Sequence, residues 1–143
     1  MAHTFFSDKT IVPACIPKAS TVTTLVAVAV DGTGFDRACF IIATGAAAAN
    51  ATLDVKITES ATTGGSYTDH APATDITQLL AATGASKVVA IDIKINPAMC
   101  FMKIAGAVGT DTFAHGAVCV LYNGTGVLPR TAAASFKEAV VVF

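Results

Sequence analysis

ATLDVKITES, residues 51–60, alternates apolar and polar side chains along its length. In an extended chain Leu53, Val55 and Ile57 fall on one face, and the polar residues between them fall on the other. KVVAIDIKI, residues 87–95, repeats the pattern with four β-branched residues on one face. A helix would spread these branched side chains around its circumference and restrict their χ1 angles. Both segments therefore predict strands with one buried face.

Further apolar runs show weaker alternation and are rich in Val, Ile, Phe and Cys. They are Thr21–Val30, Arg37–Thr44, Met99–Val108, Gly116–Tyr122 and Phe136–Phe143. Central strands, or strands covered by a partner, have this composition. Turn sequences rich in Gly, Asn and Asp separate the runs at 31–34, 63–66, 96–97 and 123–126.

Helix signals are few. Asp75–Thr83 predicts one or two helical turns, with Thr74 or Asp75 as the cap and Gly84 as the stop. The alanines at 46–49 favour helix by propensity, but four residues are too short to nucleate one.

The number and spacing of these runs predict an all-β fold. About eight strands separated by turns are typical of an antiparallel β-sandwich or a small jelly-roll-like barrel. We expect one body at residues 18–123, an extended N-terminal arm at 1–17 and an extended C-terminal arm at 124–143. The N-terminal arm contains Pro13 and Pro17, and the C-terminal arm contains Pro129.

The composition indicates a protein that assembles with other subunits. Apolar residues make up 53% of the 143 residues and charged residues only 13%, whereas about 25% is usual in soluble domains. So few charges leave the surface of an isolated subunit poorly soluble. The net charge is −1 and the basic residues are scattered, which argues against nucleic-acid partners and against an anionic membrane surface.

The first ten residues, MAHTFFSDKT, lack the basic and then apolar pattern of a secretory signal. No apolar run approaches the ~20 residues of a membrane span. We therefore expect synthesis in the cytoplasm and no membrane association.

Four cysteines are present, at positions 15, 39, 100 and 119, and none forms a C-x-x-C pair. Three of them lie in apolar runs. They are predicted to be buried free thiols rather than disulfides or metal ligands.

No residue is predicted to be catalytic, cofactor-binding or metal-ligating, and no cofactor is expected. Ser66, His70 and Asp75 are the nearest set to a triad, but one polar loop carries all three without evident oxyanion donors. Asp111 and His115 have a D-x-x-x-H spacing that favours a structural hydrogen bond over a metal site. The Gly-x-Gly turns at 32–34 and 124–126 lack any phosphate-binding fingerprint.

Four segments resemble small β-sandwich virion proteins of tailed phages, including capsid decoration (cement) proteins. They are GFDRACFII at 34–42, ATLDVKITES followed by GGSYTD at 51–69, MCFMKI at 99–104 and LPR at 128–130. The resemblance implies a structural, non-enzymatic protein of the virion that binds the major capsid protein, other virion proteins and copies of itself. A tail or head–tail connector role is the alternative within this class.

Apolar residues of the two arms are the expected subunit contacts, by strand addition or by docking in a groove. They are Phe5, Phe6, Ile11, Val12, Ile16, Val127, Leu128, Phe136, Val140, Val142 and Phe143.

Two other hypotheses stay open. A carbohydrate- or cell-surface-binding module would need Tyr67, Tyr122, Asp69 and His70 to converge in an exposed groove. A cupin-like enzyme would need His70 and His115 close enough to share a metal.

Overall fold

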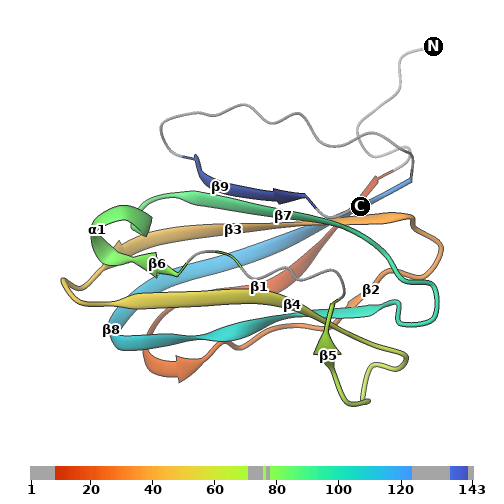
Figure 1. Ribbon diagram of the computed structural model, residues 1–143, viewed down its shortest axis with the longest axis horizontal. Helices are drawn as coiled ribbons and strands as arrows, with labels where there is room; N and C mark the ends of the chain where they lie inside the picture. Colours follow the sequence, from red (N-terminus) through yellow and green to blue (C-terminus); the bar gives the residue numbers. More distant parts are fainter. Residues whose placement is uncertain (1–8, 71–75, 77, 124–135, 142–143) are drawn as a thin grey trace, which may run out of the picture.

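The computed structural model describes residues 9–70, 76 and 78–123, together with the backbone of 136–141. The described part is mostly β-strand, with one short helical turn (Figure 1). The elements are β1 (Lys9–Thr24), β2 (Val30–Asp31), β3 (Arg37–Ala47), β4 (Thr52–Ser60), β5 (Thr68–Asp69), β6 (Leu79–Leu80), α1 (Ala81–Gly84), β7 (Val88–Lys94), β8 (Phe101–Tyr122) and β9 (Phe136–Val141). The all-β fold class is confirmed.

The long strand β8 organises the sheet. Its residues 113–122 pair with β1 and with β3, so these two strands lie on opposite edges of β8. β4 continues along the same edge as β3 and pairs with residues 101–109. β7 pairs with β3 in antiparallel orientation, and β9 pairs with β7 in parallel. The short strands β5 and β6 pair with β4, and β2 pairs with the start of β8.

The β3–β4 connection and the part of β8 opposite it both bend at the same position along the sheet. β3 passes into β4 through a turn in which the Ala51 N–H donates to the Ala48 carbonyl at 2.9 Å. Opposite this turn β8 is irregular between Gly109 and Phe113, and Thr110 adopts a positive φ of 67°. The inward side chains of β8 also change from even to odd positions there, which requires an irregular strand. The sheet therefore curls back on itself at the left of Figure 1.

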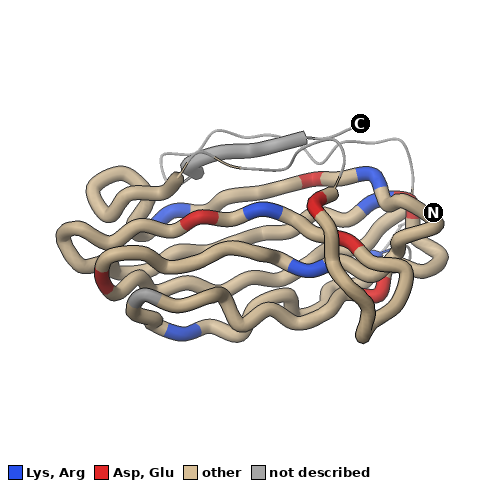
Figure 2. Tube along the Cα trace, turned by 60° about the horizontal axis from the view of Figure 1, so that its bottom comes forward, with Lys and Arg blue, Asp and Glu red and all other residues tan. Residues whose placement is uncertain are grey.

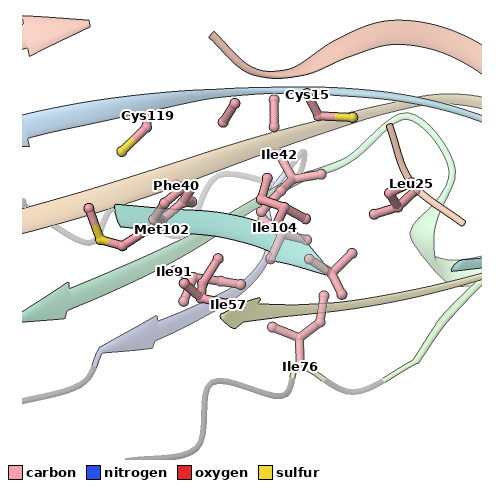
Figure 3. Packing of buried hydrophobic residues seen from close by; sticks show 14 of the residues in the cluster. Cys15, Leu25, Phe40, Ile42, Ile57, Ile76, Ile91, Met102, Ile104 and Cys119 are labelled. Atoms are coloured by element: carbon pink, nitrogen blue, oxygen red, sulfur yellow. The ribbon is translucent and has the colours of Figure 1, made fainter. Parts of the chain in front are cut away.

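One main hydrophobic core fills the inside of the curled sheet. Ile57 of β4 and Ile91 of β7 belong to the same buried cluster and are both 0% exposed. Ile57 pairs with Ile104 of β8, whereas Ile91 pairs through Phe40 of β3 with Cys119 of β8, so in a flat sheet they would lie about 50 Å apart along the strands. The curl of the sheet brings both into one core, where Figure 3 shows them among the packed side chains.

The two alternating segments are confirmed as β4 and β7. Their predicted inward residues are at most 5% exposed: Leu53, Val55, Ile57, Val89, Ile91, Ile93 and Ile95. Two polar residues, Thr58 and Asp92, expected on the outward faces, are nevertheless buried. Parts of the outward face of the sheet, at Thr58 and Asp92, are therefore shielded from solvent.

Several predicted boundaries are wrong. The run expected at Thr21–Val30 is the end of β1, a connecting segment and the two-residue strand β2. The runs expected at Met99–Val108 and Gly116–Tyr122 are one strand, β8, because pairing with β1 continues across the polar residues between them.

The helix expected at Asp75–Thr83 is a single turn at Ala81–Gly84, because Leu79 and Leu80 pair with β4 instead. No helix within the described residues is long and apolar enough to cross a membrane.

The expected N-terminal arm, residues 1–17, is part of the sheet from Lys9 onward. This half of β1 pairs with the end of β8, and Ala14 and Cys15 are 0% and 2% exposed in the core. Residues 1–8 lie outside the described residues. In the expected C-terminal arm, 124–143, the backbone of β9 adds to the edge of the sheet at β7; residues 124–135 and 142–143 lie outside the described residues.

Candidate functional site

An open apolar groove of about 680 Å³ runs across the middle of the layer formed by β1, β8 and β3. Its lining residues come from three chain segments that the sheet brings together. They are Pro13, Cys15, Ile16, Pro17, Lys18, Ile41, Ala43, Thr44, Gly45, Ala114, His115, Gly116, Ala117 and Val118. Lys18 is the only charged residue among them, His115 being neutral or cationic according to pH.

Small residues line the floor of the groove. A Cβ at Gly116 would lie 2.9–3.0 Å from the Pro17 ring, and a Cβ at Gly45 would lie 3.1 Å from the Ala114 methyl group. Strands β1, β8 and β3 therefore pack tightly here, with no bulky side chain on the floor. A partner's backbone can approach such a surface closely.

Large apolar side chains at the groove are exposed. Ile16 is 57% exposed and Val118 is 40% exposed, and Ile41 is half-buried. Single exposed apolar residues are ordinary on protein surfaces. Several of them around one apolar concavity are typical of an interaction site. Figure 2 shows how few charged positions the described chain carries as a whole.

The edge strand β1 is poorly suited to strand addition. Pro13 and Pro17 lack the N–H that a neighbouring strand needs, and register shifts occur on both sides of Cys15. Prolines, bulges and lysines are the usual features that protect an edge. The Val28 N–H also donates to the Ala14 carbonyl at 2.9 Å, which occupies part of this edge. These features make strand addition along this edge unfavourable.

A buried polar cluster lies next to the groove on the outward face. The Tyr122 hydroxyl donates to Asp92, with O–O distances of 2.8 and 2.7 Å to the two carboxylate oxygens. Arg37 Nε donates to Tyr122 Oη at 3.1 Å and to Asp92 Oδ1 at 3.3 Å. Burial, followed by the bond to Asp92, raises the pKa of Tyr122 above its ordinary value.

Ile41 connects this cluster to the groove. It packs against a small apolar group made of Cys39, Val120 and Tyr122, and it also lines the groove. The polar cluster thereby fixes the position of one wall of the groove.

A second buried polar cluster ties β5 to β4. The His70 ring contacts the Glu59 carboxylate through Nδ1, and Asn96 Nδ2 donates to the other Glu59 oxygen at 3.3 Å. His70 therefore pairs with Glu59 rather than with Ser66, which is exposed. Asp75, the third residue of that candidate triad, lies outside the described residues. The arrangement accounts for the buried histidine without a nucleophile.

The residues of the glycan-binding hypothesis occupy different environments. Tyr122 and His70 are 4% exposed, so neither presents a surface to a sugar. Tyr67 donates to the Thr63 carbonyl at 3.1 Å and carries Lys103 Nζ 4.2 Å above its ring. Asp69 accepts from Lys56 at 2.7 Å. The exposed groove required by that hypothesis is not formed by these four residues.

The other candidate ligands make local bonds. Asp111 accepts from the neighbouring Thr112 N–H at 2.7 Å, and His115 Nδ1 lies 3.0 Å from the Phe113 carbonyl. Among the described residues no group of three or more His, Cys, Asp or Glu side chains could hold a metal ion.

The four cysteines are free thiols, as predicted, and all but Cys100 are buried. Burial raises the pKa of Cys39 to about 12.

The predicted subunit contacts have different outcomes. Ile11 and Ile16 are exposed, at 45% and 57%. Val12 is half-buried and packs against the core. Phe136 and Val140 belong to β9, of which only the backbone is described. The other predicted contacts, Phe5, Phe6, Val127, Leu128, Val142 and Phe143, lie outside the described residues.

Sequence reasoning missed Val118 and Ile41. Both belong to runs that are apolar on both faces, and this pattern is the sequence signal that could have identified them.

The chain was compared with protein-family models, with curated proteins and with solved structures, and it matches none of them significantly.

Proposed function

We propose that this protein is a structural subunit that works by packing against other protein subunits through the groove on β1, β8 and β3. The observation that carries the proposal is the exposed apolar concavity around Ile16 and Val118. Burial of apolar surface stabilises an interface by roughly 25 cal/mol per Å² before the costs of association are subtracted. The low content of charged residues in the chain also supports a role in subunit packing.

We further propose that the assembly is a phage-like virion and that the chain decorates its shell. The resemblance of residues 34–42, 51–69, 99–104 and 128–130 to small virion proteins supports this assignment. A tail or head–tail connector belongs to the same structural class and would use the same groove. Copy number separates the two roles, since a shell-decorating subunit is present in many more copies than a connector.

Two matched substitutions test the proposal. Ile16→Asp places a carboxylate at the groove, whereas Val26→Asp places one at a residue that is similarly exposed, at 50%, and does not line the groove. Both positions are solvent-accessible, so both variants are expected to fold.

The assay is sedimentation of the full chain, alone and with particles purified from cells that express the other virion proteins. Ile16→Asp is expected to abolish co-sedimentation and Val26→Asp to retain it. Equal binding of the two variants would refute the role of the groove. Failure of the wild-type chain to associate with itself or with particles would refute the structural function.

A further inference from the structure

Strand β9 is held in the sheet by a single neighbour. Its backbone pairs in parallel with β7 at the edge of the sheet, and it has no other partner strand in the described part of the chain (Figure 1). Every other strand pair there is antiparallel. β9 can therefore leave the sheet without breaking any other strand pairing.

The edge of β7 is a regular template for a strand. β7 pairs with β3 without a register shift, and its sequence VVAIDIK contains no proline and no glycine. Its residues Val89, Ile91 and Ile93 are 0% exposed and anchor it in the core. The edge strand β1, by contrast, carries two prolines and several register shifts. Because β7 has none of these protective features, its backbone N–H and C=O groups need a strand to cover them.

The number of residues between β8 and β9 exceeds what pairing within one chain needs. Through β3, Tyr122 at the end of β8 is level with Lys94 of β7. Phe136 at the start of β9 lies beside Val88, at the opposite end of β7. The two ends are therefore about 20 Å apart along the strands and about 14 Å across them, or about 25 Å in all. The 13 residues 123–135 reach about 43 Å when extended, so β9 can also reach the β7 of a neighbouring subunit.

We propose that β9 is an exchangeable strand, which pairs with β7 of its own chain in the isolated subunit and with β7 of a second copy in an assembly. The strand that covers the β7 edge has the same sequence in both cases, so the register is retained, with Val89 beside Glu138 and Asp92 beside Val141. Exchange of an identical element needs no new complementary surface. Neighbouring subunits are then joined by backbone hydrogen bonds of the sheet. The inference does not depend on what the groove binds.

The balance between the two pairings depends on the concentration of subunits. A connection of this length keeps β9 near its own β7 at an effective concentration of about 1 mM. Below that concentration the exchanged fraction is proportional to the subunit concentration, so it rises roughly tenfold between about 10 and about 100 μM. Subunits packed in contact present their β7 edges at a higher local concentration, which favours exchange.

Cysteine pairing between differently substituted chains tests the proposal. Ala90 and Ala139 are register partners, and neighbouring strands lie about 4.8 Å apart, within the Cα–Cα range of a disulfide. One chain carries Ala90→Cys and a ¹⁵N label, and the other carries Ala139→Cys. Both carry Cys100→Ala, which removes the partly exposed native thiol. The chains are unfolded, mixed, refolded and then oxidised, and peptide mass spectrometry identifies the linked positions.

A disulfide between positions 90 and 139 can link a labelled to an unlabelled chain only if β9 has exchanged. We expect this linkage, with a yield that rises about tenfold between about 10 and about 100 μM. Ala43 of β3 and Val88 of β7 are also register partners, so a mixture of Ala43→Cys and Val88→Cys chains is the matched control and should stay unlinked. A chain that carries both Ala90→Cys and Ala139→Cys shows whether the two positions form a disulfide at all. Linkage within this double variant without linkage in the mixture would overturn the proposal, and so would the absence of linkage in both.

A second measurement uses the unmodified chain and does not require a variant to fold. A ¹⁵N-labelled and a ¹³C-labelled sample are unfolded, mixed and refolded at about 1 mM, where both pairings should be populated. Isotope-filtered NOEs should then connect ¹⁵N-bound protons of β7 with ¹³C-bound protons of β9. Contacts between β7 and β9 that occur only within chains of one label would also overturn the proposal.

Discussion

Replacement of Gly106 by alanine should disrupt the sheet at the centre of the β4–β8 pairing. Gly106 is the register partner of Val55, and its φ of +150° is one that L-residues rarely adopt. A Cβ at this position would lie 1.9 Å from the carbonyl oxygen of Asp54 and 3.2 Å from the Val55 Cα. Backbone atoms cannot rotate away as a side chain can, so the two strands must separate locally.

The expected loss of stability has two parts. Holding alanine at a disfavoured φ costs about 1–3 kcal/mol. Separating the strands at this position forfeits about two hydrogen bonds, at roughly 1 kcal/mol each. The sum is about 3–5 kcal/mol, a large share of the ~5–15 kcal/mol that is usual for a domain.

Two other glycines provide matched controls. Gly34 has a φ of +83° but no atom within 4 Å of a Cβ, so Gly34→Ala should cost only the strain, about 1–2 kcal/mol. Gly64 has neither feature, and Gly64→Ala should stay within about 0.5 kcal/mol of the wild type. Urea unfolding followed by circular dichroism measures all three. A loss for Gly106→Ala no larger than that for Gly34→Ala would refute the steric argument.

Three further predictions concern the outward polar cluster and the cysteines. Tyr122→Phe removes the hydroxyl that donates to Asp92, and should lower the free energy of unfolding by about 1–3 kcal/mol; an unchanged urea midpoint would contradict this. At pH 8 a thiol reagent should modify the partly exposed Cys100 before Cys39, because burial raises the pKa of Cys39 to about 12. Peptide mass spectrometry gives the order of labelling. Earlier labelling of Cys39 would show that it is not buried. Because the pKa of Cys39 is raised from 9.0, its contribution to stability is complete below pH 9 and is lost as the pH rises towards 12. The urea midpoint should therefore fall more between pH 9 and pH 11 in the wild type than in Cys39→Ala, and equal falls would count against the raised pKa.

The strands that alternate strictly could be predicted because their periodicity is local. Leu53, Val55 and Ile57 specify a buried face whatever strand lies beside them. The extent of β8 could not be predicted in this way. Gly109 and the polar residues after it look like a turn, and only pairing with β1, about 90 residues earlier in the chain, continues the strand through them.

The candidate site depended even more on distant pairing. The groove combines residues 13–18, 41–45 and 114–118, and no local pattern indicates that these segments are neighbours. The outward position of Asp92 predicted exposure, yet Arg37 and Tyr122 from two other strands bury it. The expected arm contacts were residues chosen for apolarity alone, which is why Val12 proved to pack against the core.

Hydroxyl-radical footprinting of the free chain and of the chain bound in particles tests the central claim most directly. Oxidation of Ile16 and Val118 reports whether the groove is covered, and Val26 reports on an exposed position outside it. We predict strong protection of Ile16 and Val118 in the bound chain and unchanged oxidation of Val26. Equal oxidation of Ile16 and Val118 in the free and bound states would contradict the account.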